Sequence, residues 1–303
     1  MRELVVLGTS SQVPTRTRNH NGYLLRWDGE GLLLDPGEGT QRQMIHAGVA
    51  TSQISRICLT HVHGDHCFGL PGVLSRMAVD GVEQPVHLHY PASGEETVRA
   101  LVAVAGRSVD LRLCPHGAAG EVAEGLDVVP LRHRVETYGY RLREPAGRSL
   151  VPERLAAAGL SGPAVGRLQR EGEVDGVRLE DVSVPRPGQR FAFVMDTAVC
   201  EGADELAEGA DMLVTECTFA DDDAGLAAEY SHLTAGQAGA IAGDAGAGLL
   251  VLTHFSSRYQ DVTPLVSQAQ AQADARAQTG GTRVVAAEDL DRFGFPRRRA
   301  LKQ

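Results

Sequence analysis

The amino-acid sequence predicts an α/β fold, because two kinds of segment alternate along its 303 residues. Short apolar runs rich in β-branched residues each stop at a polar or turn-rich stretch, as strands do. Segments with helical spacing or helix-start signals lie between them. Because 43% of the residues are hydrophobic, we expect a sizeable core and a chain that folds alone around a largely buried pair of sheets.

The apolar runs and the helical segments follow each other in a definite order. The predicted strands lie at residues 2–8, 23–27, 31–37, 56–61, 85–91, 126–134, 137–142, 190–197, 211–219, 249–254 and 282–288. The predicted helices lie at residues 39–48, 70–80, 94–106, 203–210, 234–246 and 261–278. Thr234 is a plausible N-cap for the helix that it opens.

Residues 141–190 break this alternation. They lose the strand signals and gather proline and glycine, which predicts a long loop, either a functional excursion or a disordered linker. The first part, residues 141–170, carries six arginines against two glutamates, a local net charge of +4. This part is the best candidate for a polyanion-binding patch. The alternative is a solvated loop whose charge arose by chance.

Bulk composition limits the class of protein. A net charge of −10 means that the surface as a whole does not attract nucleic acid, so a polyanion partner needs a local basic patch. Five cysteines without a CxxC pair argue against a disulfide framework or a cysteine-bound zinc ribbon, and predict reduced thiols. The N-terminus lacks a secretory pattern and no apolar run has the length of a membrane helix. We therefore expect a soluble cytoplasmic protein.

The segment LTHVHGDHCFGLPG, residues 59–72, places three histidines and one aspartate within six positions. Imidazole and carboxylate are ligands that borderline divalent metals prefer. Within this loop, the alternate residues His61 and His63 can face one metal while Asp65 and His66 turn toward another. Three more polar residues follow other predicted strands, and they are His133, Asp196 and His254. Since seven ligands are too many for one zinc, the pattern indicates more than one metal ion.

The motif HVHGDH resembles the HxHxDH signature of the metallo-β-lactamase superfamily, and the later His, Asp and His resemble its other metal motifs in matching order. Further stretches are similar to one branch of that superfamily, the ribonuclease Z family. They are PTRTRN (14–19), LLDPGEGTQRQM (33–44), HCFGLPGVL (66–74), LSGPAVGRLQREGE (160–173) and HFSSRY (254–259). The resemblance covers nearly the whole chain. It implies a four-layer αβ/βα sandwich, a single domain over residues 1–303 with a protruding flexible arm at 145–185 that serves as a tRNA exosite.

The family resemblance also implies an activity. The chain would be a zinc-dependent endoribonuclease that removes the 3′ trailer of tRNA precursors by hydrolysis after the discriminator nucleotide, leaving a 3′-hydroxyl. It would bind two zinc ions per subunit, take precursor tRNA as its partner and form a homodimer. Two alternatives stay open: a metallo-hydrolase of small phosphodiesters or sulfate esters, and an RNA-binding protein whose metal site serves stability.

The resemblance assigns roles to particular residues. The first zinc would be bound by His61, His63 and His133, the second by Asp65, His66 and His254, with Asp196 as the bridge. Asp65 would orient or deprotonate the attacking water. His232 would stabilise charge in the transition state or protonate the leaving 3′ oxygen. The alternative for His232 is a helix-entry residue near the Thr234 cap.

Other residues are implied around the site. Arg18 and Asn19 would contact RNA, although loop hydrogen bonding is the alternative for both, and Gly162 and Pro163 belong to the arm motif. Asp35 and Glu216 would support the metal ligands and His232 from behind, although Glu216 could equally be a buried structural carboxylate. We expect structural roles for His20, His46, His87, His89, His116 and Cys67.

Two features depart from the family pattern. Met195 precedes Asp196 where the family more often has glycine, so we expect different packing beneath the metal site. The acidic runs at residues 220–223 and 287–291 leave limited surface for RNA. We therefore expect RNA contacts at the arm and at the metal cleft.

Overall fold

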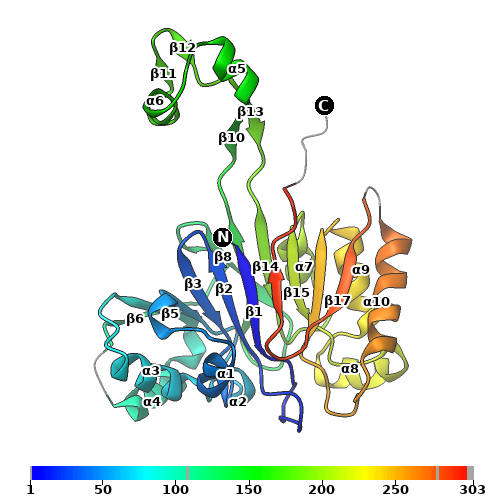
Figure 1. Ribbon diagram of the computed structural model, residues 1–303. Coiled ribbons are helices and arrows are strands. Elements are labelled where there is room, and N and C mark those ends of the chain that lie inside the picture. The colour runs from blue at the N-terminus through cyan, green and yellow to red at the C-terminus, as the bar shows by residue number, and fades with distance from the viewer. Residues whose placement is uncertain (1, 107–108, 278–279, 299–303) are drawn as a thin grey trace. The chain divides into compact units, whose positions relative to one another are not determined.

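A computed structural model describes residues 2–106, 109–277 and 280–298, and the chain divides into two compact units (Figure 1). The first unit contains residues 2–142 and 190–296. The second contains residues 143–189 together with 297–298. Each unit has its own core, so each is described separately.

The first unit contains two seven-stranded sheets. In spatial order the first sheet contains β18 (Arg292–Gly294), β1 (Glu3–Gly8), β2 (Gly22–Trp27), β3 (Glu30–Leu34), β4 (Arg56–Cys58), β5 (Val86–Pro91) and β6 (Leu111–His116). The second contains β17 (Arg283–Ala286), β16 (Leu249–Thr253), β15 (Met212–Glu216), β14 (Arg190–Val194), β9 (Thr137–Arg143), β8 (Leu126–Leu131) and β7 (Gly120–Ala123). Strands β3 to β6 are parallel to one another, as are β14 to β17.

Helices cover the outer face of each sheet (Figure 1). The first sheet packs against α1 (Thr40–His46), α3 (Leu70–Val79) and α4 (Glu95–Ala105), and the second against α7 (Glu201–Ala207), α9 (Ala235–Asp244) and α10 (Thr263–Arg276). A third apolar cluster, which includes Tyr23, Phe193 and Met195, lies between the sheets. The predicted four-layer sandwich is therefore confirmed.

Local sequence explains where several elements begin and end. At the start of α9 the Thr234 hydroxyl accepts from the Gln237 amide at 3.3 Å, and the Gln237 side chain accepts from the Thr234 amide at 2.9 Å. This reciprocal pair is the capping box that stabilises a helix start. Helix α4 stops at Gly106, which has a left-handed φ of 77°. Strands β15 and β16 are buried along their whole length, because neighbours cover both of their faces.

Short elements were missed in the sequence. They are α2 (Gly64–Cys67) and α8 (Ala224–Tyr230), the strands β6, β7 and β18, and the 3-10 turns η1 (Thr51–Gln53), η2 (Ala92–Gly94) and η3 (Asp221–Asp223). The helix predicted at 261–278 ends at Arg276, and residue 278 lies outside the described residues.

The second unit corrects the prediction of a long loop. It contains α5 (Pro152–Ala157), α6 (Pro163–Glu171), the strand pair β10 (Gly147–Leu150) with β13 (Ser183–Arg186), and the pair β11 (Glu173–Val174) with β12 (Val177–Arg178). A small core of Leu160, Leu168, Val174 and Val182 holds these elements together. Strands of two to four residues are too short to produce a recognisable periodicity, so no strand pattern is visible in this part of the sequence. The arm bounds 145–185 and its flexibility stay predictions.

The cysteines and the helices bear on two further expectations. All five cysteines are unpaired, as predicted, and Cys58, Cys67 and Cys217 are buried. Among the described residues, no helix combines the length and the apolar character that a membrane crossing requires.

Candidate metal centre

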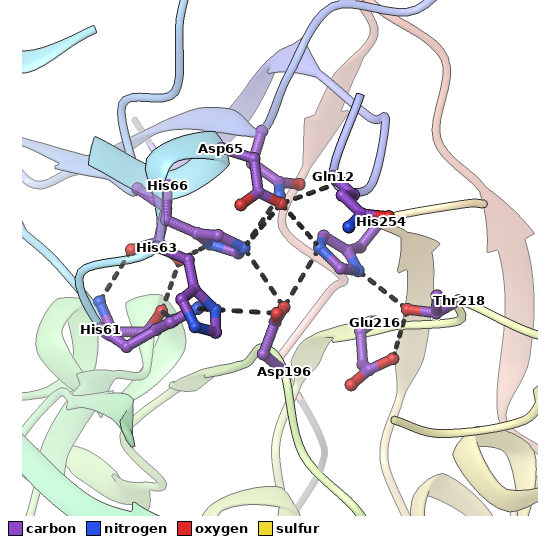
Figure 2. A network of polar contacts seen from close by, with 12 residues as sticks. Gln12, His61, His63, Asp65, His66, Asp196, Glu216, Thr218 and His254 are labelled. Atoms are coloured by element: carbon purple, nitrogen blue, oxygen red, sulfur yellow. Dashed lines mark hydrogen bonds and ion pairs between the residues drawn. The ribbon is translucent and has the colours of Figure 1, made fainter. Parts of the chain in front are cut away.

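The seven predicted metal ligands come together where strands of the two sheets end, and Figure 2 shows most of them converging on Asp196. From the first sheet, the loop after β4 supplies His61 and His63, and helix α2 supplies Asp65 and His66. From the second sheet, His133 follows β8, Asp196 follows β14 and His254 follows β16. The sequence prediction therefore located all seven side chains within one centre. Whether they bind metal stays a prediction.

The two carboxylate oxygens of Asp196 face different sets of histidines. Oδ2 lies 3.6 Å from Nε2 of His61 and 3.6 Å from Nε2 of His133. Oδ1 lies 3.3 Å from Nε2 of His66 and 3.1 Å from Nε2 of His254. The donor atoms accordingly form one group of His61, His63, His133 and Asp196, and a second group of Asp65, His66 and His254. This grouping matches the predicted division into two sites with Asp196 between them.

Hydrogen bonds on the outer side of the first histidines fix which ring nitrogen carries the proton. Nδ1 of His66 donates to Asp35 Oδ2 at 2.9 Å. Nδ1 of His61 donates to the Thr60 hydroxyl at 3.0 Å, because that hydroxyl donates onward to Asp35 Oδ2 at 2.7 Å. Nδ1 of His133 donates to the Ser231 carbonyl at 3.1 Å. Nε2 of each ring is thereby turned toward the interior of the centre, where Nε2 of His61 also lies 3.0 Å from Nδ1 of His63. Burial lowers the pKa of His66, but nearby carboxylates, Asp196 first, outweigh it and raise that pKa well above its ordinary value.

Glu216 organises the other side of the centre from a fully buried position at the end of β15. Its carboxylate accepts from Nδ1 of His232 at 2.9 Å and from the Thr218 hydroxyl at 2.5 Å. Because Thr218 donates to Glu216, Nδ1 of His254 donates to Thr218 at 2.8 Å. One carboxylate therefore sets the ring orientation of both His232 and His254, and the sequence had not predicted the Thr218 link.

The centre fits a divalent cation. Asp196 Oδ1 and His254 Nε2 are buried without a hydrogen-bond partner, which is costly unless something else satisfies them. A cation held between these two atoms would satisfy both of them. Nitrogen and carboxylate donors within 4.8 Å of one another suit zinc and similar borderline metals.

Backbone geometry at this edge is unusual. Asp35, Asp196 and His254 each follow a buried strand and each has a positive φ, of 43°, 43° and 58°. Such left-handed residues cost on the order of 1–3 kcal/mol each and are found where function requires them. A Cβ on Gly69 would lie 1.9 Å from the Gly37 carbonyl oxygen, so the two loops can approach only as glycines. A Cβ on Gly37 would lie 2.1 Å from the Asp65 carbonyl oxygen, so these approaches account for Gly37 of DPGEGTQ and Gly69 of HCFGLPG.

Burial and charge act against each other in the centre. Burial raises the pKa of the Asp196 carboxyl, but the neighbouring imidazoles, His254 first, hold it well below its usual range. Burial holds the pKa of His61 well below its ordinary value. Burial also lowers the pKa of His232, but the carboxylates of Glu216 and Asp196 outweigh it and raise that pKa to about 9. His232 is therefore cationic at neutral pH, with Nε2 4.0 Å from Asp196 Oδ2.

A cavity of 630 Å³ opens over the centre. Five of the metal-centre residues and His232 line its base, and the side chains of Phe68, Arg134, Phe219, Tyr230 and Arg258 are among those that surround them. The cavity is large enough for parts of an extended substrate around one reacting bond.

The predicted RNA-contacting residues Arg18 and Asn19 take part in loop structure. The Arg18 guanidinium donates to the Thr9 hydroxyl at 3.2 Å and lies 4.8 Å from the centre of the Phe255 ring. The Asn19 side chain donates to the Glu38 carbonyl at 2.8 Å. The Asn19 backbone donates to Asp289 at 2.6 Å, a contact that the sequence did not predict. Their substrate contacts stay predictions, as do those of Gly162 and Pro163, which lie at the start of α6 in the second unit.

The remaining histidines and Cys67 mostly lie away from the centre. His46 and His87 are exposed, and His89 and His116 are buried at the far strands of the first sheet. His20 differs, because it lines the cavity, with Nε2 3.1 Å from the Gln12 carbonyl. Cys67 is fully buried next to His66, and burial raises the pKa of its thiol to about 12.

The chain is similar to known proteins along nearly its whole length and theirs. The family model described as the beta-lactamase superfamily domain matches residues 31–255. The chain is 56% identical to a ribonuclease Z of Streptomyces avermitilis over 98% of this chain and 99% of that protein, and 55% identical to a ribonuclease Z of Nocardia farcinica over 98% and 99%. The crystal structure of the short form of human tRNase Z matches the fold with a TM-score of 0.67 at 22% identity, over 97% of this chain and 99% of that chain.

Proposed function

We propose that the chain, which belongs to the ribonuclease Z family of the beta-lactamase superfamily, is an endoribonuclease that removes the 3′ trailer of precursor tRNA. Cleavage follows the discriminator nucleotide and leaves a 3′-hydroxyl on the tRNA and a 5′-phosphate on the trailer. The observation that carries this proposal is the two-part cluster around Asp196 at the base of a cavity, in a chain aligned with ribonuclease Z relatives along nearly its whole length.

Two zinc ions per subunit complete the proposed site. His61, His63 and His133 hold the first, Asp65, His66 and His254 hold the second, and Asp196 bridges them. When bound, zinc supplies Lewis acidity that favours deprotonated water near neutral pH and offsets charge on the phosphodiester. The hydrogen bonds from the outer ring nitrogens to Asp35, Thr60, Ser231 and Thr218 support this assignment, since they hold the inner nitrogens ready to ligate.

Asp65 handles the attacking water in this proposal. Its carboxylate faces the cavity, is 13% exposed, and accepts from the Gln12 backbone amide at 2.9 Å. That hydrogen bond fixes the carboxylate, so one oxygen can orient the water and take its proton. The water oxygen forms the new bond to phosphorus while the bond from phosphorus to the 3′ oxygen breaks.

His232 acts on the leaving oxygen. Glu216 holds the ring through Nδ1 and keeps it protonated at neutral pH, so Nε2 is left to face the cavity. A protonated Nε2 can stabilise charge on the phosphate and deliver its proton to the departing 3′ oxygen. This role uses the raised pKa of His232, whereas a simple helix-entry residue would need no buried carboxylate beside it.

The second unit is the proposed tRNA exosite, but its charge is more balanced than residues 141–170 indicated. Residues 143–189 contain seven arginines and seven acidic residues. Arg148 is engaged within the unit, where it donates to the Ser183 hydroxyl at 2.7 Å. We take Arg167 and Arg170 of α6, close in sequence to Gly162 and Pro163, as the basic patch, in which Arg167 lies 3.9 Å from the Asp175 carboxylate.

A homodimer in the cytoplasm completes the proposal. The side chains of Ile45, Val79 and Val104 are 61%, 83% and 77% exposed on α1, α3 and α4, the helices that cover the first sheet. Exposed apolar side chains on neighbouring helices favour burial against a second subunit. Arg18 and Asn19 are proposed to contact the RNA near the cut.

The test compares the intact protein with a variant that lacks residues 148–180, on a precursor tRNA and on a small phosphodiester. We expect the variant to lose RNA cleavage and to keep hydrolysis of the small ester. A smaller change than the deletion is the double variant Arg167→Gln with Arg170→Gln. Its matched control is Arg178→Gln, because the Arg178 guanidinium pairs with Glu180 at 2.7 Å. Loss of both activities on deletion would contradict a separate exosite. Hydrolysis of the small ester alone by the intact protein would favour the small-phosphodiester or sulfate-ester alternative.

A further inference from the structure

One wall of the cavity consists of four side chains stacked in a row, Arg134, Tyr230, Phe219 and Arg258. The Arg134 guanidinium carbon lies 4.7 Å from the centre of the Tyr230 ring. The Tyr230 and Phe219 rings lie 6.4 Å apart with planes 23° from parallel. The Arg258 guanidinium carbon lies 5.5 Å from the centre of the Phe219 ring. We call these four side chains the stacked row.

The stacked row is buried in the middle and exposed toward its ends. Phe219 is 5% exposed and anchors the row, whereas Tyr230 is 39% exposed and the Arg258 side chain is 47% exposed. Arg134, which is also exposed, donates to the Glu229 carbonyl at 3.2 Å, and Arg258 donates to the Ser256 hydroxyl at 3.3 Å. Each guanidinium group thus lies over a ring and also makes a hydrogen bond. Little conformational entropy remains to be lost when a ligand binds them.

The row stands directly beside the reacting groups. Its Phe219 ring lies 6.1 Å from the His232 ring. Arg134 immediately follows the predicted ligand His133, and Arg258 lies four residues after His254. The row therefore lies next to the place where the scissile phosphate would bind.

We propose that the stacked row binds the two unpaired nucleotides that flank the scissile phosphate, one base on Arg134 over Tyr230 and the other on Arg258 over Phe219. The inference rests on the proposed function, since it takes RNA as the substrate. Guanidinium planes and aromatic rings stack on any base, so they grip single-stranded RNA without reading its sequence. Arg134 and Arg258 also place positive charge where the RNA must approach, with Arg258 3.9 Å from the Asp223 carboxylate.

Arginine-to-lysine variants test the stacking itself, because lysine keeps the positive charge but lacks the planar guanidinium group that stacks on a base. Arg134→Lys and Arg258→Lys are assayed on an intact precursor and on two precursors with an abasic position, one immediately 5′ and one immediately 3′ of the cut. On intact RNA we expect each variant to lower kcat/KM by roughly 5- to 100-fold. The decrease in kcat/KM caused by each variant should vanish on one of the two abasic substrates. The substrate on which it vanishes should differ between Arg134→Lys and Arg258→Lys. Equal penalties on all three substrates would overturn the proposal.

Comparing substrates within each variant cancels any general damage to the enzyme. Phe68→Leu is the matched control, because Phe68 is 60% exposed and lines the same cavity outside the row. In the Phe68→Leu background, we expect each arginine variant still to lose its kcat/KM penalty on one abasic substrate. This dependence of the penalty on the base is the coupling between each arginine and its base. A Phe68 change that abolished this coupling would contradict the assignment to the row.

A binding measurement separates this proposal from the proposed function. The dissociation constant of a short, uncleavable single-stranded RNA is measured for the zinc-loaded protein, for Tyr230→Leu and for Tyr230→Phe. We expect weaker binding by the leucine variant and normal binding by the phenylalanine variant, which keeps the ring beneath Arg134. If the protein shows this pattern yet cuts no precursor, the proposed function fails and the row stands. If the protein cuts the precursor and the leucine variant binds normally, the row fails alone.

Discussion

Replacing Asp35 by asparagine should weaken metal binding although Asp35 is no predicted ligand. The carboxylate is fully buried, and it accepts from the Thr60 amide at 2.7 Å, from the Thr60 hydroxyl at 2.7 Å and from Nδ1 of His66 at 2.9 Å. An asparagine in either orientation places an NH₂ group against one of these donors. Asparagine tolerates the positive φ of 43° at this position, so the backbone need not change.

The expected loss follows from the tautomer of His66. With an amide NH₂ in place of Oδ2, the ring must accept at Nδ1, and its proton moves to Nε2, the atom that faces Asp196. Loss of such a supporting carboxylate typically reduces metal affinity 10- to 100-fold, or about 1.4–2.8 kcal/mol. The same NH₂ group faces the Thr60 hydroxyl, which then donates to Nδ1 of His61 instead of accepting from it. The loss should therefore fall on both predicted sites, the one with His66 and the one with His61.

The assay is a zinc titration against a chromophoric chelator, which resolves the two sites by affinity. We expect Asp35→Asn to weaken both sites, because Asp35 supports His66 directly and His61 through Thr60. Asp127→Asn is the matched control, since Asp127 is a buried carboxylate on β8 that pairs with Arg141 at 3.3 Å, outside the cluster around Asp196. Unchanged zinc affinity in Asp35→Asn, or an equal loss in Asp127→Asn, would refute the reasoning.

Three further changes follow from the same structure. His232→Asn should lower kcat on precursor tRNA by about 10²- to 10⁴-fold, the usual contribution of a general acid, and a loss below tenfold would count against that role. Met195→Ala should destabilise the protein by about 2–5 kcal/mol in denaturant unfolding, because Met195 is fully buried between the sheets, and a change below 1 kcal/mol would contradict its packing role. Burial lowers the pKa of His89 from 6.5 to about 4, with smaller contributions from Arg56, His116 and His87. Between these two pH values, the unfolded chain therefore binds a proton at His89 and the folded chain does not. Unfolding free energy should therefore fall by about 2 kcal/mol between pH 6.5 and pH 5 on account of His89, and chelator-treated His89→Asn should lack this part of the pH dependence.

The sequence predicted the positions of the metal-centre residues because each sits where an apolar run ends. His133, Asp196 and His254 directly follow β8, β14 and β16 or lie within two residues of them, and strand ends of an α/β fold gather at one edge. The layer architecture followed from the same alternation of apolar runs and helical segments. These features are local, so one sequence suffices to see them.

The supporting hydrogen bonds could not be predicted in the same way. The hydroxyls of Thr60 and Thr218 hydrogen-bond to Nδ1 of His61 and of His254. A threonine at the end of a strand looks the same in the sequence whether or not its hydroxyl holds such a histidine. Asp289 was counted among acidic residues that limit RNA binding, whereas it accepts from the Asn19 amide and orders the 14–19 loop. Asn19 and Asp289 are 270 positions apart and Thr218 and His254 are 36 apart, so only the fold brings these residues together.

The second unit and the stacked row were missed for related reasons. The second unit folds through strands of two to four residues, for which period-two alternation has no room to appear. In the stacked row, Arg134 and Arg258 lie in the loops after β8 and β16, and Tyr230 is the last residue of α8. No spacing in the sequence links them.

The most direct test of the proposed activity is to map the cleavage of an end-labelled precursor tRNA to the nucleotide, with zinc-loaded wild-type protein and with Asp65→Ala. The proposal predicts one cut after the discriminator nucleotide by the wild type and none by the variant. No cut by the wild type, or the same cut by both proteins, would contradict it.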